Sequence, residues 1–240
     1  NSALRLSFGP QNTVEEAAAV REAVETMVPG ALYYGRADVS DYIKDKREPV
    51  MFDGDIHRLR FVPKNGGREV WVCEAGIHPV SLGAGADQVS GDFPHYLEAY
   101  VNAQGADAVF IQGAQLAITS NTESLSYDAS SGAAARAKAL GEALGARLAA
   151  IESELSLSPV LHVTHRELFV DIDNEILTLA GREGLLGTVF VKKGLTGYAA
   201  VTEIGYMELG GYLGRYDLGG QVRALTMTRQ RLERLLAREE

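Results

Sequence analysis

The fold is decided by residues 71–121, which read WVCEAGIHPVSLGAGADQVSGDFPHYLEAYVNAQGADAVFIQGAQLAITSN. An apolar run opens this stretch and stops at His78-Pro79, and a glycine-rich loop follows it. Asp92-Phe93-Pro94 then begins a helix-type segment, and a second apolar run, 108–111, ends at Gln112. Two short apolar strands joined by a helix form one βαβ unit. Because open α/β sheets bind ligands at the carboxyl ends of such strands, we expect His78 and the loop after Gln112 to lie on the same edge.

The residues outside this unit alternate between strand and helix patterns. Thr13 and Glu16 form a capping box before an alanine-rich run, which predicts a helix over 14–28. A turn at 63–67 joins two strands into a hairpin. The further elements that we expect are strands at 31–39, 57–62, 69–76, 159–172, 188–192 and 199–208, a long helix at 131–155 and an amphipathic helix at 222–238. This order predicts a mixed α/β fold, with helices packed on a mixed sheet in a single domain that spans residues 1–240.

The composition is that of a globular protein with a sizeable core, since 46% of the 240 residues are hydrophobic. The formal charge of -9 and the lack of a Lys/Arg cluster argue against a nucleic-acid partner. No run is long enough for a transmembrane segment, and residues 1–10 lack a signal-peptide pattern. We expect a soluble protein; the cytoplasm is favoured, and secretion follows if a leader was removed. Cys73, the single cysteine, lies in an apolar run and is expected to be a buried, inert thiol.

Several motifs occur together and in a fixed order. The apolar strand before His78-Pro79, the glycine-rich loop, the GDFP motif at 91–94, the helix and the FIQGA motif at 110–114 resemble the neutral/alkaline non-lysosomal ceramidase family. The family is meant in its broad sense, which includes bacterial relatives of unassigned substrate. Residues 45–53 (DKREPVMFD) and 201–210 (VTEIGYMELG) agree with the resemblance, which covers roughly residues 38–210.

The resemblance implies a zinc-dependent hydrolase of an amide bond, with His78 as one metal ligand. Without the resemblance, a histidine at a strand end is more often a hydrogen-bonded structural residue. A catalytic zinc normally needs three protein ligands, and the family draws the others from a histidine motif near the start of the domain and from a glutamate and a tyrosine near its end. No histidine precedes His57, and no Pro-Gly-Glu segment follows Gly210. Either the chain has lost its metal, or segments before residue 1 and near residue 211 are missing from the sequence, and we favour the second explanation.

The loop after the second apolar run is where the family places a nucleophilic serine. Thr119 stands nearest to that serine, and Gln112 and Gly113 begin the loop. We take these three residues as candidate catalytic residues. The aspartate before the family's serine and the proline after it are absent, so a metal-bound hydroxide is an alternative nucleophile. An ordinary turn-forming hydroxyl is the structural alternative for Thr119.

Three further polar residues are candidates for the site. Asp92 directly precedes the helix pattern, so it is either an N-cap or a partner that holds the ring of His78, and the two roles are compatible. Arg47 is a candidate for binding a substrate anion, and Asn121 is a second candidate for substrate binding. His57 has no partner at a spacing that indicates a metal site.

These features predict a hydrolase that acts on an N-acyl lipid or a related small amide through a metal-activated water or hydroxyl. The alternative, from a different class, is a non-catalytic binding or scaffold protein that keeps the fold without the metal. The residues assign neither ceramide itself as the substrate nor an oligomeric state.

Overall fold

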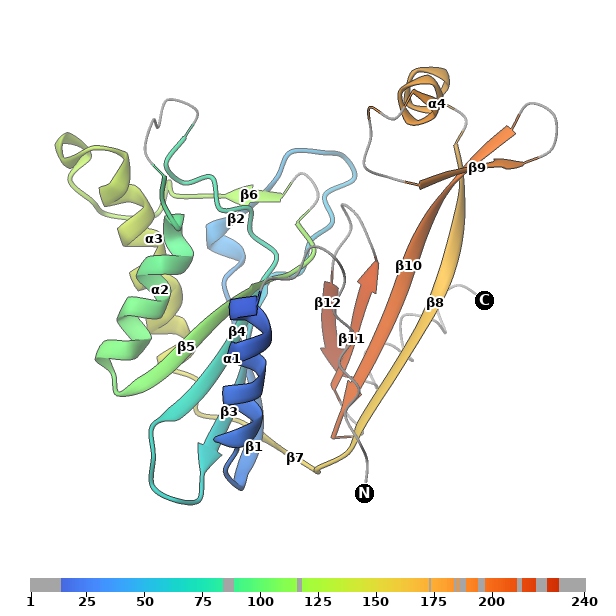
Figure 1. Ribbon diagram of the computed structural model, residues 1–240. Helices are drawn as coiled ribbons and strands as arrows, with labels where there is room; N and C mark the ends of the chain where they lie inside the picture. The colour runs from blue at the N-terminus through green and yellow to red at the C-terminus, as the bar shows by residue number, and fades with distance from the viewer. Residues whose placement is uncertain are drawn as a thin grey trace.

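A five-stranded mixed sheet carries the unit around His78 (Figure 1). The computed structural model describes residues 14–83, 89–115, 118–172, 174–183, 185, 189–193, 197–210, 213–218 and 224–228. The strand order is β5 (Ala106–Gln112), β4 (Glu69–Ala75), β3 (Asp55–Pro63), β1 (Gly30–Asp38) and β7 (Leu155–Leu157). Strands β4 and β5 run parallel and are connected by α2 (Asp92–Ala103), whereas the other neighbours are antiparallel. The predicted βαβ unit and the predicted hairpin of β3 and β4 are confirmed.

Helices α2 and α3 (Ala133–Ala149) cover one face of this sheet (Figure 1). The fully buried residues of α2 and α3 include Phe93, Leu97, Val101, Leu140, Leu144 and Leu148. Within each helix these residues stand four apart, which places them on one face. Gly141 lets the two helices approach closely, because a Cβ at this position would lie 2.5 Å from the carbonyl oxygen of Phe93. The predicted mixed α/β fold with helices packed on the sheet is confirmed.

Cys73 lies in this core and is fully buried. Burial raises the pKa of its thiol to about 12, so hardly any thiolate forms at neutral pH. This agrees with the predicted inert thiol. Helix α1 (Val14–Glu25) lies within the predicted range, but α3 ends at Ala149 rather than at residue 155. The chain turns there into β7, in which Leu155 pairs with Tyr34 of β1.

A second sheet lies beside the first (Figure 1). Its order is β12 (Ala224–Thr228), β11 (Leu213–Leu218), β10 (Gly197–Leu209) and β8 (Leu161–Ile172), with β9 (Val189–Lys193) also paired to β10 and α4 (Glu175–Arg182) between β8 and β9 in sequence. The two sheets meet at β7, where Leu209 packs against the cluster of Tyr34 and Leu157. The predicted strands over 159–172, 188–192 and 199–208 are confirmed.

The amphipathic helix predicted over 222–238 is wrong for the residues that the structure describes. Residues 224–228 form β12, which pairs antiparallel with β11 so that Leu213 faces Thr228. This segment reads ALTMT, and its two threonines suit a strand that has a partner, because strand preference depends on cross-strand packing. The remainder of the predicted helix lies outside the described residues. Among the helices that are described, none is both long and apolar enough to cross a membrane.

Candidate functional site

Three segments from distant parts of the chain meet at the carboxyl ends of β4 and β5. Strand β2 (Ile43–Asp45), which follows the 3-10 helix η1 (Ser40–Tyr42), pairs with β6 (Ile118–Ser120). Lys44 therefore lies opposite Thr119. His78 forms a parallel bridge with Thr119, and the backbone N–H of His78 donates to the carbonyl of Ile118 at 3.2 Å. The expectation that His78 and the loop after Gln112 share one edge is confirmed.

Glycines allow the two strand ends to pass each other closely. A Cβ at Gly76 would lie 2.4 Å from the carbonyl oxygen of Ala114, and a Cβ at Gly113 would lie 3.0 Å from the carbonyl carbon of Ala75. The side-chain amide of Gln112 donates to the carbonyls of Ala75 at 3.1 Å and Ile77 at 3.0 Å. Gln112 thus positions the backbone that leads into His78. Catalytic roles for Gln112 and Gly113 stay predictions.

His78 presents its imidazole at the surface of this edge. The residue is exposed, and its ring makes no hydrogen bond to the described part of the chain. Thr119 is half-buried, and its hydroxyl donates to the carbonyl of Lys44 at 3.4 Å, which is a long contact. A weakly held hydroxyl can change partners when a substrate carbonyl arrives, since catalytic hydrogen bonds often tighten only in the substrate complex.

The buried carboxylate of Asp92 is occupied by backbone groups. Helix α2 begins at Asp92, so Gly91 is its N-cap and the predicted N-cap role of Asp92 is one position off. The φ of 51° at Asp92 lies in the left-handed region. Its Oδ1 accepts from the N–H of Phe93 at 2.6 Å, and its Oδ2 accepts from the N–H of Leu82 at 3.0 Å. Asp92 therefore ties the first turn of α2 to the loop after His78. No described contact joins Asp92 to the ring of His78, so its role as a partner of that ring stays a prediction.

A pocket of about 270 Å³ opens beside the His78–Thr119 pair. It is lined by Lys44, Lys46, Val80, Ser81, Gly83, Thr119, Ser120, Thr122 and Arg136. Ser81 is only 2% exposed, and its hydroxyl donates to Oγ of Ser120 at 3.3 Å. The Nε–H of Arg136 donates to the carbonyl of Ser81, which holds the first turn of α3 against this loop. We call this cavity the His78 pocket because it lies beside the bridge of His78 with Thr119, although His78 itself is not among its lining residues.

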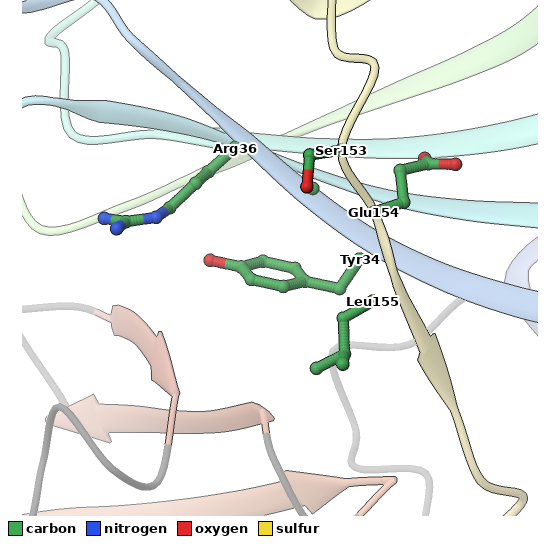
Figure 2. Close-up of a pocket in the computed structure, with 6 residues that line it drawn as sticks. Tyr34, Arg36, Ser153, Glu154 and Leu155 are labelled. Carbon is green, nitrogen blue, oxygen red and sulfur yellow. The ribbon is translucent and has the colours of Figure 1, made fainter.

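A second cavity, of about 410 Å³, lies near β1 and β7 (Figure 2). Its lining consists of Tyr34, Gly35, Arg36, Ser153, Glu154 and Leu155. The charged members of this lining already have partners, because Arg36 pairs with Asp55 and Glu154 pairs with Arg58. This cavity therefore offers little unsatisfied charge to a ligand.

The phenol of Tyr34 is also engaged. It is hydrogen-bonded to Nδ1 of His57 at 2.8 Å, and Nε2 of His57 lies 3.1 Å from Oδ2 of Asp53. Burial raises the pKa of Tyr34 above its ordinary value, so the hydroxyl stays protonated at neutral pH. His57 thus has two close partners that its position in the sequence did not reveal. Both ring nitrogens of His57 are therefore hydrogen-bonded within the chain, which is typical of a structural cluster.

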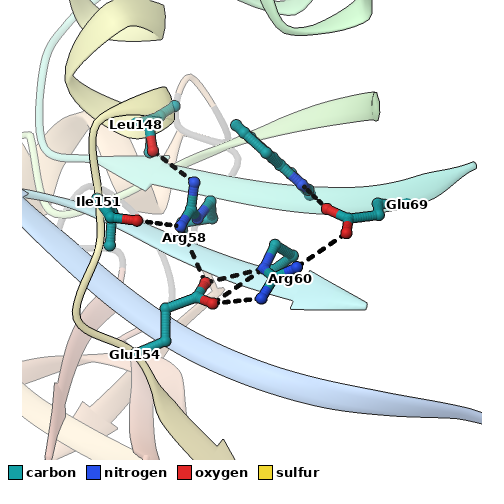
Figure 3. A network of polar contacts seen from close by, with 7 residues as sticks. Arg58, Arg60, Glu69, Leu148, Ile151 and Glu154 are labelled. Carbon is teal, nitrogen blue, oxygen red and sulfur yellow. Dashed lines mark hydrogen bonds and ion pairs between the residues drawn. The ribbon is translucent and has the colours of Figure 1, made fainter. Parts of the chain in front are cut away.

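Ion pairs fix the wall of the second cavity to the first sheet (Figure 3). The buried guanidinium of Arg58 donates to the carbonyls of Leu148 and Ile151, where α3 ends. Carbonyls at a helix end lack partners within the helix, so Arg58 satisfies them. Glu154 accepts hydrogen bonds from both Arg58 and Arg60. Burial opposes ionisation of Glu154, but these two arginines hold the pKa of its carboxyl below the ordinary value.

The described residues do not fit a complete zinc site. They contain no group of three or more His, Cys, Asp or Glu side chains that could hold a metal ion. A catalytic zinc normally needs three protein ligands and an open position. Within the described part of the chain, His78 is therefore a candidate ligand without a complete set of the further ligands that a zinc ion needs.

Arg47 and Asn121 flank the His78 pocket without lining it. The backbone N–H of Arg47 donates to Oδ1 of Asp45 at 3.0 Å in an exposed turn. The backbone N–H of Asn121 donates to the carbonyl of Tyr42 at 2.8 Å, and its Oδ1 accepts from the N–H of Glu123 at 3.2 Å. Both residues lie next to the paired strands β2 and β6, and their substrate-binding roles stay predictions.

Among the described lining residues, Thr119 is the one that was a candidate in the sequence; the polar and charged lining residues that were not are Lys44, Lys46, Ser81, Ser120, Thr122 and Arg136. The two lysines flank Asp45 at the start of the DKREPVMFD motif. Their place around the start of this motif was the one sequence feature that could have marked them as site residues. Arg136 offered no local signal, since it lies in a helix whose periodicity indicates packing alone.

The comparisons with known proteins agree with the fold. No protein-family model and no curated protein matches the sequence. Among solved structures, the chain is similar to neutral ceramidase from Pseudomonas aeruginosa, with a TM-score of 0.53 and 16% identity over 82% of this chain and 41% of that chain. It is also similar to a ceramidase complexed with C2, with a TM-score of 0.56 and 15% identity over 82% of this chain and 42% of that chain.

The molecule therefore has a mixed α/β fold that is distantly similar to that of neutral ceramidases. The chain spans about two fifths of the length of the two ceramidase chains. At 15–16% identity, the likeness shows the fold alone.

Proposed function

We propose that this chain acts as a hydrolase of an amide bond, with His78 and Thr119 at the reaction centre. The observation that carries the proposal is the backbone bridge that makes these two residues neighbours at the carboxyl ends of the parallel strands β4 and β5. Ligands of open α/β sheets bind at such ends. The likeness in fold to ceramidases supports an N-acyl substrate, either a lipid amide or a smaller relative.

The proposed reaction uses the side chains of these two residues. The hydroxyl oxygen of Thr119 attacks the amide carbonyl carbon, while the imidazole of His78 accepts the hydroxyl proton. The C–N bond then breaks, the amine leaves with that proton, and the acyl group remains as an ester on Thr119. A water molecule attacks this ester and gives its proton to His78, which returns a proton to Thr119. The products are a carboxylic acid and an amine.

Zinc ligation is an alternative role for His78, because an imidazole whose basic nitrogen binds zinc cannot accept the hydroxyl proton of Thr119. When bound, such an ion polarises a carbonyl or lowers the pKa of its bound water. At least two further protein ligands are required, and the described residues hold no group of three His, Cys, Asp or Glu side chains that could supply the whole set. For this reason the steps above use only the residues of the chain.

The proposal is tested by assaying the purified protein with a panel of short N-acyl amides and measuring its zinc content by mass spectrometry. We expect release of the carboxylic acid, and we expect His78→Gln to lower the rate by at least about a hundredfold. If His78 is a zinc ligand rather than the base, the variant will lose zinc. The matched control is His95→Gln, because His95 is exposed on α2 and has no bridge to Thr119.

The second candidate is a binding or scaffold protein without catalysis. It is favoured by the lack of a three-ligand metal group among the described residues. Absence of acid release from every amide, in a protein that is folded and that contains no zinc, would favour this candidate.

A further inference from the structure

The His78 pocket is basic, although the whole chain is acidic. The chain has a formal charge of -9. Lys44, Lys46 and Arg136 nevertheless line the pocket, and among the residues that the structure describes no carboxylate does. The lysines come from β2 and the residue after it, and the arginine comes from the first turn of α3, so the fold gathers these charges from two distant segments.

The positive charges are largely available to a ligand. Lys44 lies 3.7 Å from a carboxylate oxygen of Glu123, but both side chains are more than half exposed, so water screens this pair. Lys46 and Arg136 make no ion pair within the described part of the chain. Arg136 uses its Nε–H to bind the carbonyl of Ser81, which orients the guanidinium and leaves its terminal amino groups available.

Hydroxyl groups complete the lining. Ser81, Thr119, Ser120 and Thr122 surround the basic groups. Gly83 leaves room for the guanidinium, because a Cβ at this position would lie 3.0 Å from Nη2 of Arg136. The hydroxyls of Ser81 and Thr119 already donate within the chain, so the donors that remain are the basic side chains and the hydroxyls of Ser120 and Thr122. The ligand that best satisfies such a set is an oxyanion.

We propose that the His78 pocket binds an oxyanion group of the substrate, so that the preferred substrate is an acidic N-acyl amide rather than a neutral one. This inference rests on the proposed function, because it assumes that the substrate's amide lies at His78 and Thr119. The cavity of about 270 Å³ is smaller than a typical drug-sized site, so it accommodates a carboxylate or phosphate group while the acyl chain extends outward. A neutral amide leaves the lysines and the arginine without a partner.

Binding of matched compounds tests the inference. Calorimetric titrations at low salt would compare N-hexanoylglycine, its neutral methyl ester and N-hexanoylethanolamine phosphate. We expect both anionic compounds to bind about tenfold more tightly than the ester, and we expect the difference to shrink with added salt. The two anionic compounds distinguish a carboxylate from a phosphate as the favoured group.

Variants localise the effect. Lys44→Gln and Lys46→Gln should each weaken binding of the anionic compounds by about two- to fivefold and leave the ester unaffected. Arg136→Lys keeps the charge and loses the forked geometry, so it should weaken the phosphate more than the carboxylate. Lys64→Gln is the control, because Lys64 is exposed in the turn after β3 and does not line the pocket.

Equal binding of acid and ester, no binding of either, or a preference that survives the double Lys44→Gln, Lys46→Gln variant would overturn the inference. Its failure is distinguishable from failure of the proposed function. Cleavage of amides without regard to charge would keep the hydrolase and remove the oxyanion site. Charge-selective binding without any cleavage would keep the site and remove the hydrolase.

Discussion

His78 and Thr119 are bridge partners even though α2 and β5 lie between them in the sequence. The pairing arises because β4 and β5 run parallel, so the residues that follow both strands emerge at the same edge of the sheet. Thr119 then also pairs with Lys44 of β2. Thr119, the proposed nucleophile, is thus a backbone neighbour of both His78, the proposed base, and Lys44, which lines the pocket.

Replacement of Gly76 by alanine should destabilise the protein by about 1–3 kcal/mol. The added Cβ would lie 2.4 Å from the carbonyl oxygen of Ala114. Because this oxygen belongs to the backbone, it can move away only if the segments after β4 and β5 separate. Urea unfolding measures the change. Gly54→Ala is the matched control, because its Cβ would meet its nearest atom at 3.4 Å, an ordinary contact. Equal stability of the Gly76 and Gly54 variants would contradict the close approach.

Asp92→Ala should lower the free energy of unfolding by about 1–2 kcal/mol, because the N–H groups of Leu82 and Phe93 lose their acceptor. Asp92→Asn should recover part of the loss, since asparagine keeps one acceptor oxygen and tolerates the left-handed backbone. Thermal unfolding measures both variants. A structural role predicts unchanged metal content. Loss of metal in Asp92→Asn, with stability retained, would instead indicate a partner of His78.

The stability of the protein should fall in acid partly through Glu154. Its pKa in the folded protein is held below the ordinary value of 4.5, so its contribution is present above about pH 4.5 and is lost as pH falls through the folded pKa. Glu154→Gln should therefore lower stability at pH 7 and flatten the dependence of the urea midpoint on pH between pH 7 and 3. Glu142→Gln, at an exposed position of α3, should leave that dependence unchanged. Identical pH profiles for wild type and Glu154→Gln would refute the assignment.

Local patterns in the sequence accounted for the parts of the fold that depend on neighbouring residues. The run before His78 and the run before Gln112 predicted two strands with a helix between them, and parallel pairing fixed their common edge. Leu140, Leu144 and Leu148 marked the buried face of α3 for the same reason. Each of these features follows from periodicity within one segment.

The parts that sequence reasoning missed depend on distant partners. Residues 224–228 have leucine at a helical spacing from later residues, but pairing with β11 makes them a strand. Helix α3 stops at Ala149 where Arg58 of β3 binds the carbonyls of Leu148 and Ile151. The basic pocket requires Arg136 to reach the loop at Ser81. A single segment contains no signal for any of these contacts.

The central claim is that Thr119 and His78 form a reaction centre for amide hydrolysis. Its most direct test is the rate of acid release from an N-acyl amide by Thr119→Val, which removes the hydroxyl and keeps the shape, beside Thr119→Ser, which keeps the hydroxyl. Thr26→Val is the control, because the hydroxyl of Thr26 only donates to the carbonyl of Glu22 at the end of α1. We predict a loss of at least about a hundredfold for Thr119→Val and measurable activity for Thr119→Ser and Thr26→Val. Wild-type activity in Thr119→Val would contradict the account.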